Sequence, residues 1–132
     1  MTSKALICDE NQVFSLADVV LPEPGPDRLR VRTLRSGVSI GTEFALIRRK
    51  LDWGPYPLCT GYQAVGCVEE VGENVEGFAV GDLVYYRDGK HLALPDGTAI
   101  SSVAGTHAAH AIIHPKETHG LAHLPAGCDL DA

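Results

Sequence analysis

The sequence has few basic side chains, no long apolar run and no signal-like N-terminus. Its 132 residues include 11 Lys or Arg against 17 Asp or Glu, which gives a formal charge of −6. Because no basic stripe is available to neutralise phosphates, we expect no nucleic acid partner. No stretch approaches the ~18 apolar residues of a membrane helix, and the first residues lack the apolar core of a signal peptide. We therefore expect no membrane partner and a cytoplasmic protein.

Closely paired cysteines are also absent. The four cysteines are Cys8, Cys59, Cys67 and Cys128, which lie far apart along the chain. None has the C-x-x-C spacing of a zinc ribbon or of a thioredoxin-like redox site. The thiols are therefore expected to be free and reduced.

Turn-forming residues are abundant, with 14 glycines and eight prolines, and this favours a single, mainly β domain. Between Leu29 and Thr33 apolar residues alternate with arginines, which is the period of a half-buried strand. The best helix candidate spans residues 42–50, with Thr42 as N-cap and three basic residues in its last turn. Further extended segments are predicted at residues 4–8, 13–20, 63–71, 83–86, 91–94, 108–114 and 121–125.

Residues 61–86 carry the most specific pattern of the chain. Their glycines Gly66, Gly72 and Gly81 indicate positive φ angles or close approach of another backbone. The string V-E-E-V-G-E-N-V-E-G-F-A-V-G-D, residues 68–82, resembles a segment of the GroES-like domain of the medium-chain dehydrogenase/reductase family. The resemblance implies a mainly β fold, a partly open antiparallel barrel with one or two short helices. Residues 1–132 would form its substrate-binding domain.

The same resemblance implies an oxidoreductase that uses NAD or NADP and acts on a small-molecule alcohol or carbonyl substrate. The Rossmann fingerprint G-x-G-x-x-G, which would hold the cofactor, does not occur in this sequence. We therefore expect the cofactor domain in cis in a longer enzyme, and no cofactor binding or activity in this chain alone. The alternative is a stand-alone, non-catalytic module that binds a ligand or a protein partner. A co-chaperonin subunit shares only the fold.

Zinc-dependent members of this family bind the metal through a cysteine in C-G-T-D and a histidine in G-H-E. The segments here are S-G-V-S-I-G-T-E and G-Y-Q. Ser39 or Ile40 stands at the cysteine position, Tyr62 replaces the histidine, and Gln63 replaces the glutamate. These changes remove strong zinc donors together. The resemblance thus points to a zinc-lacking branch, with no metal ligand in the chain.

Without zinc, hydroxyl groups are the natural candidates to polarise the substrate oxygen. We predict catalytic roles for Thr42, Tyr62 and Ser39. The residues predicted to bind substrate are Trp53, Glu43 and Gln63. Structural roles are the alternatives: Thr42 as a helix cap, Tyr62 as a packed aromatic, and Glu43 as an acceptor of backbone N–H bonds.

Three of the six histidines lie close together, at His107, His110 and His114. In a strand, His110 and His114 share one face while His107 points to the other, which is poor geometry for a single metal ion. The stretch G-T-H-A-A-H-A-I-I-H-P also resembles a structural strand of the family, G-x-x-A-E-Y-x-x-x-P. We therefore predict structural rather than metal-binding roles for these histidines.

Overall fold

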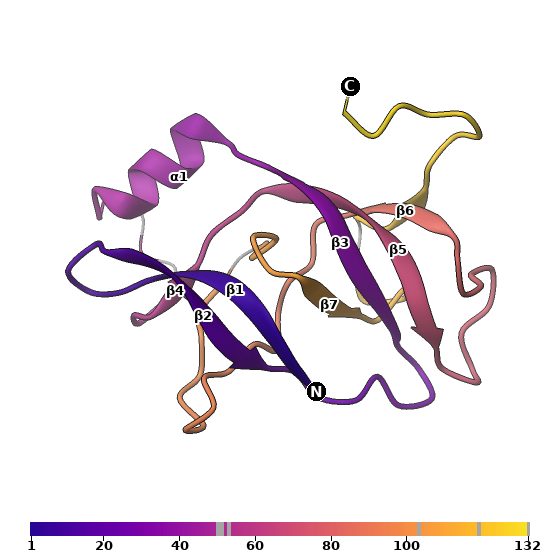
Figure 1. Ribbon diagram of the computed structural model, residues 1–132, viewed down its shortest axis with the longest axis horizontal. Helices are drawn as coiled ribbons and strands as arrows, with labels where there is room; N and C mark the ends of the chain where they lie inside the picture. The colour runs from indigo at the N-terminus through magenta and orange to yellow at the C-terminus, as the bar shows by residue number, and fades with distance from the viewer. Residues whose placement is uncertain (50–51, 53, 103, 119, 132) are drawn as a thin grey trace.

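The computed structural model describes residues 1–49, 52, 54–102, 104–118 and 120–131. Its strands form two antiparallel sheets, neither of which closes (Figure 1). The strand order is β2-β1-β4 in the smaller sheet and β7-β3-β5-β6-β8 in the larger. The elements are β1 (Thr2–Cys8), β2 (Phe14–Val20), β3 (Leu29–Gly37), α1 (Ile40–Ile47), β4 (Leu58–Cys59), β5 (Gln63–Val71), β6 (Leu83–Tyr86), β7 (His110–Ile113) and β8 (Ala122–His123). The predicted mainly β, partly open architecture is confirmed.

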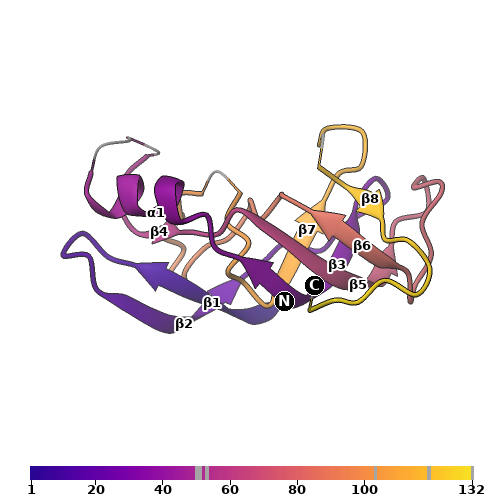
Figure 2. The same cartoon turned by 90° about the horizontal axis from the view of Figure 1, so that it is seen from above.

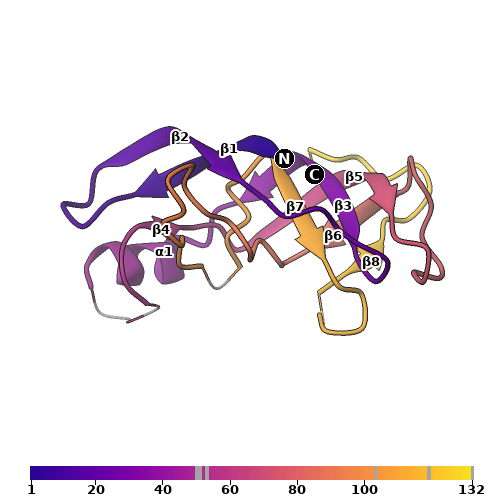
Figure 3. The same cartoon turned by 90° about the horizontal axis from the view of Figure 1, so that it is seen from below.

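The chain begins with a long hairpin of β1 and β2, whose register runs from Thr2 opposite Val20 to Cys8 opposite Phe14. The carboxylate of Asp9 builds the turn because its Oδ1 accepts the backbone N–H groups of Asn11 and Val13 at 2.9 and 3.0 Å. The hairpin and α1 lie on opposite sides at one end of the molecule, away from β8 (Figures 2 and 3).

The larger sheet is centred on β3 and β5. At Gly66 a Cβ atom would lie 2.4 Å from the Arg32 carbonyl oxygen, which confirms the close backbone approach predicted there. A bulge or irregularity shifts the register between Thr33 and Arg35. No helix among the described residues is long and apolar enough to cross a membrane.

Two details of the predicted secondary structure are wrong. The helix begins at Ile40 rather than Thr42, because the Ser39 carbonyl accepts the Glu43 N–H at 2.9 Å and so takes the N-cap place. It ends at Ile47, before the basic residues, and the predicted last residue, Lys50, lies outside the described residues. The predicted strand at 91–94 contributes only isolated bridges from Ala93 to Val20 and Ala99.

One segment, residues 106–113, ties the two sheets together. The His107 carbonyl accepts the Leu6 N–H at 2.8 Å, and the Ala109 carbonyl accepts the Thr33 N–H at 2.9 Å. In β7 the side chain of Ile112 belongs to the core cluster of the smaller sheet, while Ala111 and Ile113 belong to that of the larger. This alternation is the period of two expected of a strand between two apolar layers.

Candidate functional site

The first turn of α1 contains a buried carboxylate. Glu43 is 8% exposed. Its Oε2 accepts the backbone N–H of Ser39 at 2.6 Å, and its Oε1 lies 2.7 Å from Nε2 of His107. Glu43 therefore accepts a backbone N–H bond, as the structural alternative for this residue predicts, and it also meets a histidine far along the chain.

The second ring nitrogen of His107 makes a further hydrogen bond, toward the protein surface. Nδ1 lies 2.8 Å from Oγ of Ser36, near the end of β3. A carboxylate is an acceptor, so chemistry assigns the proton to Nε2 of neutral His107 and makes Nδ1 an acceptor for the Ser36 hydroxyl. The three side chains, from α1, β3 and the segment before β7, thus form one hydrogen-bonded line.

The loop before β5 fixes the place of His107. Gly61 has a φ of +118°, and a Cβ atom there would lie 2.4 Å from Thr106 Oγ1 and 2.6 Å from the His107 nitrogen. The His107 N–H donates to the Thr60 carbonyl at 3.0 Å, and the hydroxyl of buried Thr106 donates to the Gln63 carbonyl at 3.2 Å. Only glycine permits this approach, so Gly61 sets the position of His107 against α1.

Tyr62 and Gln63 lie beside the end of β3. The Tyr62 N–H donates to the Gly37 carbonyl at 3.3 Å, and its ring is 36% exposed. The guanidinium carbon of Arg87 lies 4.1 Å from the centroid of that ring. Within the described part of the chain the Tyr62 hydroxyl has no hydrogen-bond partner. The Tyr62 ring is therefore exposed and contacts the Arg87 guanidinium, and it is not the packed aromatic of the structural alternative.

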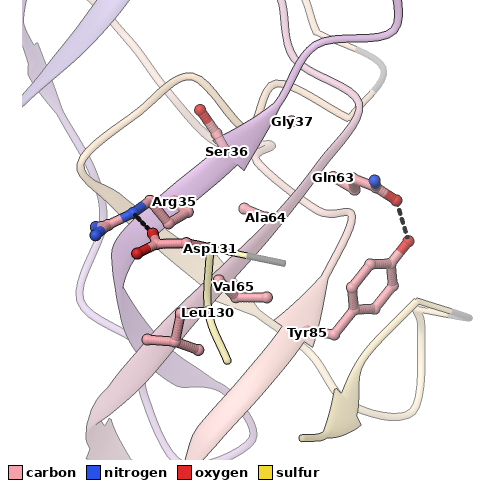
Figure 4. Close-up of a pocket in the computed structure, with 9 residues that line it drawn as sticks. All are labelled: Arg35, Ser36, Gly37, Gln63, Ala64, Val65, Tyr85, Leu130 and Asp131. Atoms are coloured by element: carbon pink, nitrogen blue, oxygen red, sulfur yellow. Dashed lines mark hydrogen bonds and ion pairs between the residues drawn. The ribbon is translucent and has the colours of Figure 1, made fainter. Parts of the chain in front are cut away.

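A pocket of about 390 Å³ opens between β3, β5, β6 and the last described residues (Figure 4). On one side the Tyr85 hydroxyl donates to Oε1 of Gln63 at 3.0 Å, and on the other Arg35 pairs with Asp131 at 2.8 Å. Its lining residues are Arg35, Ser36, Gly37, Gln63, Ala64, Val65, Tyr85, Leu130 and Asp131.

A second, apolar cavity of about 190 Å³ lies between α1 and the β1–β2 hairpin. Its polar lining comes from Glu43, Thr60 and His107, and the rest is apolar. The apolar lining residues are Leu6, Phe14, Val38, Ile40, Phe44 and Ile47. Val38, Ile40 and Phe44 are 66%, 67% and 52% exposed, so the mouth of this cavity is an apolar surface.

The structure brings together only part of the predicted site. Ser39 and Glu43 are in contact, and Tyr62 and Gln63 follow one another at the start of β5. Thr42 is half-buried in the first turn of α1, and within the described residues its hydroxyl makes no hydrogen bond. Trp53 lies outside the described residues.

Two members of the line, Ser36 and His107, were missed as candidates from the sequence. His107 was assigned to a structural strand. Its partner Glu43 is 64 positions away, and Ser36 is 71 positions away. No local spacing joins these residues, so only the fold reveals the contact.

The donors of this region do not fit a catalytic zinc ion. Both ring nitrogens of His107 and both oxygens of Glu43 are already engaged. Burial raises the pKa of the nearby Cys59 thiol to about 12, and its Sγ lies 3.5 Å from the Gly105 carbonyl oxygen. In the described ranges no group of three or more His, Cys, Asp or Glu side chains could hold a metal ion. We therefore derive no step through a metal.

The three clustered histidines do not converge either. His107 meets Glu43 and Ser36, whereas His110 Nδ1 lies 2.7 Å from the Ser3 hydroxyl. His114 Nδ1 accepts the Lys116 N–H at 3.3 Å. Each histidine thus has a separate set of partners.

Comparison with known proteins gives the class of this domain. Residues 25–125 match the family described as the alcohol dehydrogenase GroES-like domain. The acryloyl-coenzyme A reductase of Sulfurisphaera tokodaii is 36% identical over 87 residues, which are 66% of this chain and 25% of that protein. The chain therefore belongs to the alcohol dehydrogenase GroES-like domain family, and the resemblance to medium-chain dehydrogenases/reductases is confirmed.

Solved structures share the fold. An alcohol dehydrogenase zinc-binding domain protein from Burkholderia ambifaria superposes with a TM-score of 0.83 at 18% identity, over 99% of this chain and 44% of that chain. The structure of CAD from Helicobacter pylori complexed with NADP(H) gives a TM-score of 0.77 at 15% identity, over 99% of this chain and 44% of that chain. The chain thus spans a quarter to less than half of the length of these relatives.

Proposed function

We propose that this chain is the substrate-binding domain of a zinc-independent, NAD(P)-dependent oxidoreductase of the cytoplasm. Its substrate is a small alcohol or carbonyl compound. In this proposal a Rossmann domain in cis binds the cofactor, which supplies or accepts the hydride. The chain alone then lacks activity. The family match and the NADP(H)-bound structural relative support this reading.

One observation carries the zinc-independent part of the proposal. At the positions where the resemblance places the metal ligands of zinc-dependent relatives, this chain has Ser39 or Ile40, Tyr62 and Gln63, while Glu43 is bound by His107 and Ser39. A serine, a phenol and an amide are weak zinc donors. They are good hydrogen-bond donors, and a carbonyl oxygen that gains charge can be stabilised by such groups.

Within this site the hydroxyls of Tyr62, Thr42 and Ser39 contact the substrate oxygen. Tyr62 is best equipped, because its hydroxyl makes no hydrogen bond to the described residues and the Arg87 cation lies over its ring. A guanidinium so close stabilises negative charge that develops at the phenol oxygen or on the substrate. The residues proposed to orient the rest of the substrate are Gln63, Trp53 and Glu43.

The alternative, a stand-alone binding module, is disfavoured by the surface around α1. Val38, Ile40 and Phe44 are more than half exposed and border one cavity. A soluble module that works alone has little reason to expose such a patch, whereas a domain that meets a substrate and a second domain does.

The test is to replace Tyr62 by phenylalanine in the longer enzyme that contains this chain. Tyr62→Phe removes one hydroxyl and keeps the ring under Arg87, so we expect kcat to fall about a hundredfold, the scale of general acid–base catalysis. Tyr56→Phe is the matched control, because Arg49 lies over the Tyr56 ring at 5.6 Å in the same way. Steady-state kinetics with NAD or NADP and simple alcohols measure both variants.

Equal turnover of Tyr62→Phe and wild type would contradict the role of the phenol. Metal analysis of the same preparations checks the zinc-independent part. Well under one zinc per chain is expected, and near-stoichiometric zinc would overturn it.

A further inference from the structure

The line of Glu43, His107 and Ser36 runs from the protein interior to its surface. Glu43 is 8% exposed, the His107 side chain is 11% exposed, and Ser36 is exposed. The two hydrogen bonds of the line measure 2.7 and 2.8 Å. The family-like motifs of the sequence do not predict that a carboxylate, an imidazole and a hydroxyl group are hydrogen-bonded one after another.

Only one member of the line has hydrogen-bonding capacity left at the surface. Glu43 uses one oxygen for Ser39 and the other for His107, and His107 uses both nitrogens. The Ser36 hydroxyl gives its proton to His107, retains lone pairs, and has no other protein partner among the described residues. Ser36 is therefore the point at which the line can meet a bound molecule.

Ser36 also lies at the edge of the larger pocket. It is one of the residues that line that pocket, and its hydroxyl points away from the Gln63–Tyr85 pair (Figure 4). Glu43 and His107 line the smaller apolar cavity. The line thus runs from the smaller apolar cavity to the surface, and the Ser36 hydroxyl lies on the face of the sheet opposite to the side chains of Arg35 and Tyr85.

We propose that Ser36 exchanges a proton with the substrate oxygen, through a relay in which His107 accepts the Ser36 proton and Glu43 holds His107. This inference rests on the proposed oxidoreductase function. In alcohol oxidation the substrate O–H proton moves to Ser36 Oγ while the Ser36 proton moves to His107 Nδ1. A nicotinamide cofactor bound by the second domain would accept the substrate C–H hydride, so that a carbonyl compound and an imidazolium at His107 result. Carbonyl reduction reverses each transfer.

The surroundings of His107 suit this task. The proton would create an imidazolium next to the Glu43 carboxylate, and the pair is nearly excluded from water, where opposite charges attract more strongly. Ser36 is the catalytic residue of the relay, because it touches the substrate. His107 and Glu43 act through it, and Glu43 positions the ring by its bond to Nε2.

The first test uses the chain itself. The relay requires neutral His107 to carry its proton on Nε2, so that Nδ1 can accept from Ser36. Nitrogen-15 NMR of the labelled imidazoles should show the Nε2–H tautomer for His107, and Glu43→Gln should change the signals of this histidine and leave those of His123 in place. Protonation of His107 on Nδ1 at neutral pH would overturn the relay.

The second test uses the longer enzyme. Ser36→Ala should lower kcat about a hundredfold with KM changed by less than about threefold, and Ser36→Thr should restore kcat to within about tenfold of wild type. The matched control is Ser15→Ala, an exposed serine on β2. A relay of two protons should also give a solvent deuterium isotope effect on kcat in wild type that disappears or changes in Ser36→Ala.

Unchanged kcat in Ser36→Ala, while wild type is active, would overturn the relay and leave the oxidoreductase proposal in place. A wild-type enzyme without NAD(P)-dependent turnover would overturn both. If Ser36→Ala does not fold, Ser36→Thr and the tautomer of His107 in the wild-type chain still decide, because the relay fails if Nδ1 carries the proton.

Discussion

Two histidine–carboxylate pairs of the described residues have the same chemistry and different surroundings. In one pair, His107 Nε2 lies 2.7 Å from Glu43, and the two side chains are 11% and 10% exposed. In the other, His123 Nε2 lies 3.2 Å from Asp82, and the side chains are 51% and 33% exposed. A third contact, of His110 with Glu69, is longer at 3.5 Å and intermediate in exposure.

The difference shows that burial, more than the pairing itself, determines what such a contact does. Water screens the His123–Asp82 pair, and exposed pairs contribute only about 0–1 kcal/mol. Around His107 little water is present, so loss of one partner would leave the other polar group unsatisfied. Surface pairs tolerate change, whereas the buried pair constrains the position of both side chains.

The strongest test of this comparison removes each histidine in turn. His107→Ala leaves the buried Glu43 carboxylate without its main partner, so we expect the free energy of unfolding to fall by about 3 kcal/mol. His123→Ala loses an exposed pair and the stacking of its ring on Phe78, whose centroid is 4.5 Å away. Its expected cost is about 1 kcal/mol. Urea denaturation of the isolated chain measures both variants.

Equal losses for the two variants would show that burial does not separate the pairs. Glu43→Gln is a useful companion, because it keeps the shape of the side chain and removes its charge. A smaller loss in this variant than in His107→Ala is expected.

A somewhat smaller effect is expected at the glycine that positions His107. Gly61→Ala requires a φ near +118° and places a Cβ 2.4 Å from Thr106 Oγ1. Strain and overpacking together should cost about 2–3 kcal/mol. At Gly77 φ is +83° and no atom lies within 4 Å of an added Cβ, so Gly77→Ala should cost only about 1 kcal/mol.

Thermal unfolding of the Gly61→Ala and Gly77→Ala proteins measures these two losses of stability. The His107 imidazole signals give a second measurement, since Gly61→Ala should shift them and Gly77→Ala should not. A Gly61→Ala protein as stable as Gly77→Ala would mean that the loop can move away from Thr106 without loss.

The smallest effect concerns His110. Burial lowers the pKa of this imidazole below 6.5, the nearby Glu69 carboxylate opposes the shift, and Arg30 and Arg32 reinforce it. The folded state therefore binds the proton less readily than the unfolded state. This part of the stability is fully present above about pH 6.5 and is lost as the pH falls below that value. His110→Gln, which can still hydrogen-bond to Ser3 Oγ, should flatten the acid slope.

The slope is measured from the urea concentration at the midpoint of unfolding at about pH 7.5 and about pH 5.5. These two pH values lie above and below the ordinary pKa of a histidine. If His110→Gln keeps the full acid slope, another group is responsible.

Much of the fold could be predicted from the sequence because its signals are local. Alternation of apolar residues predicted β3, and the glycine-broken run predicted β5 and β6 with correct bounds. The helix start was misplaced because Thr42 and Ser39 are both good caps, and the choice between them depends on the reach of Glu43 back to Ser39. Segment 91–94 has strand composition, yet only Ala93 finds bridge partners.

The site was harder to predict because its contacts are not local. The motif comparison led to Ser39, Tyr62 and Gln63, which lie just after β3 and at the start of β5. It could not lead to His107, whose importance depends on a contact with Glu43 across 64 positions. Charge, spacing and periodicity in the sequence cannot predict such a pair, because it forms only when residues 106–113 pack between the two sheets.

That segment has a consequence for how the protein is made. A ribosome that has released α1 and β3 has supplied Glu43 and Ser36 but not His107, and residues 106–113 must follow before either sheet is tied to the other. A nascent chain that ends before residue 106 contains the Glu43 carboxylate but not the His107 imidazole that pairs with it. Contacts of such long sequence separation require the closure of a long loop, which slows folding. The domain therefore cannot form its buried polar line before residues 106–113 are present, and a product that ends before them lacks it.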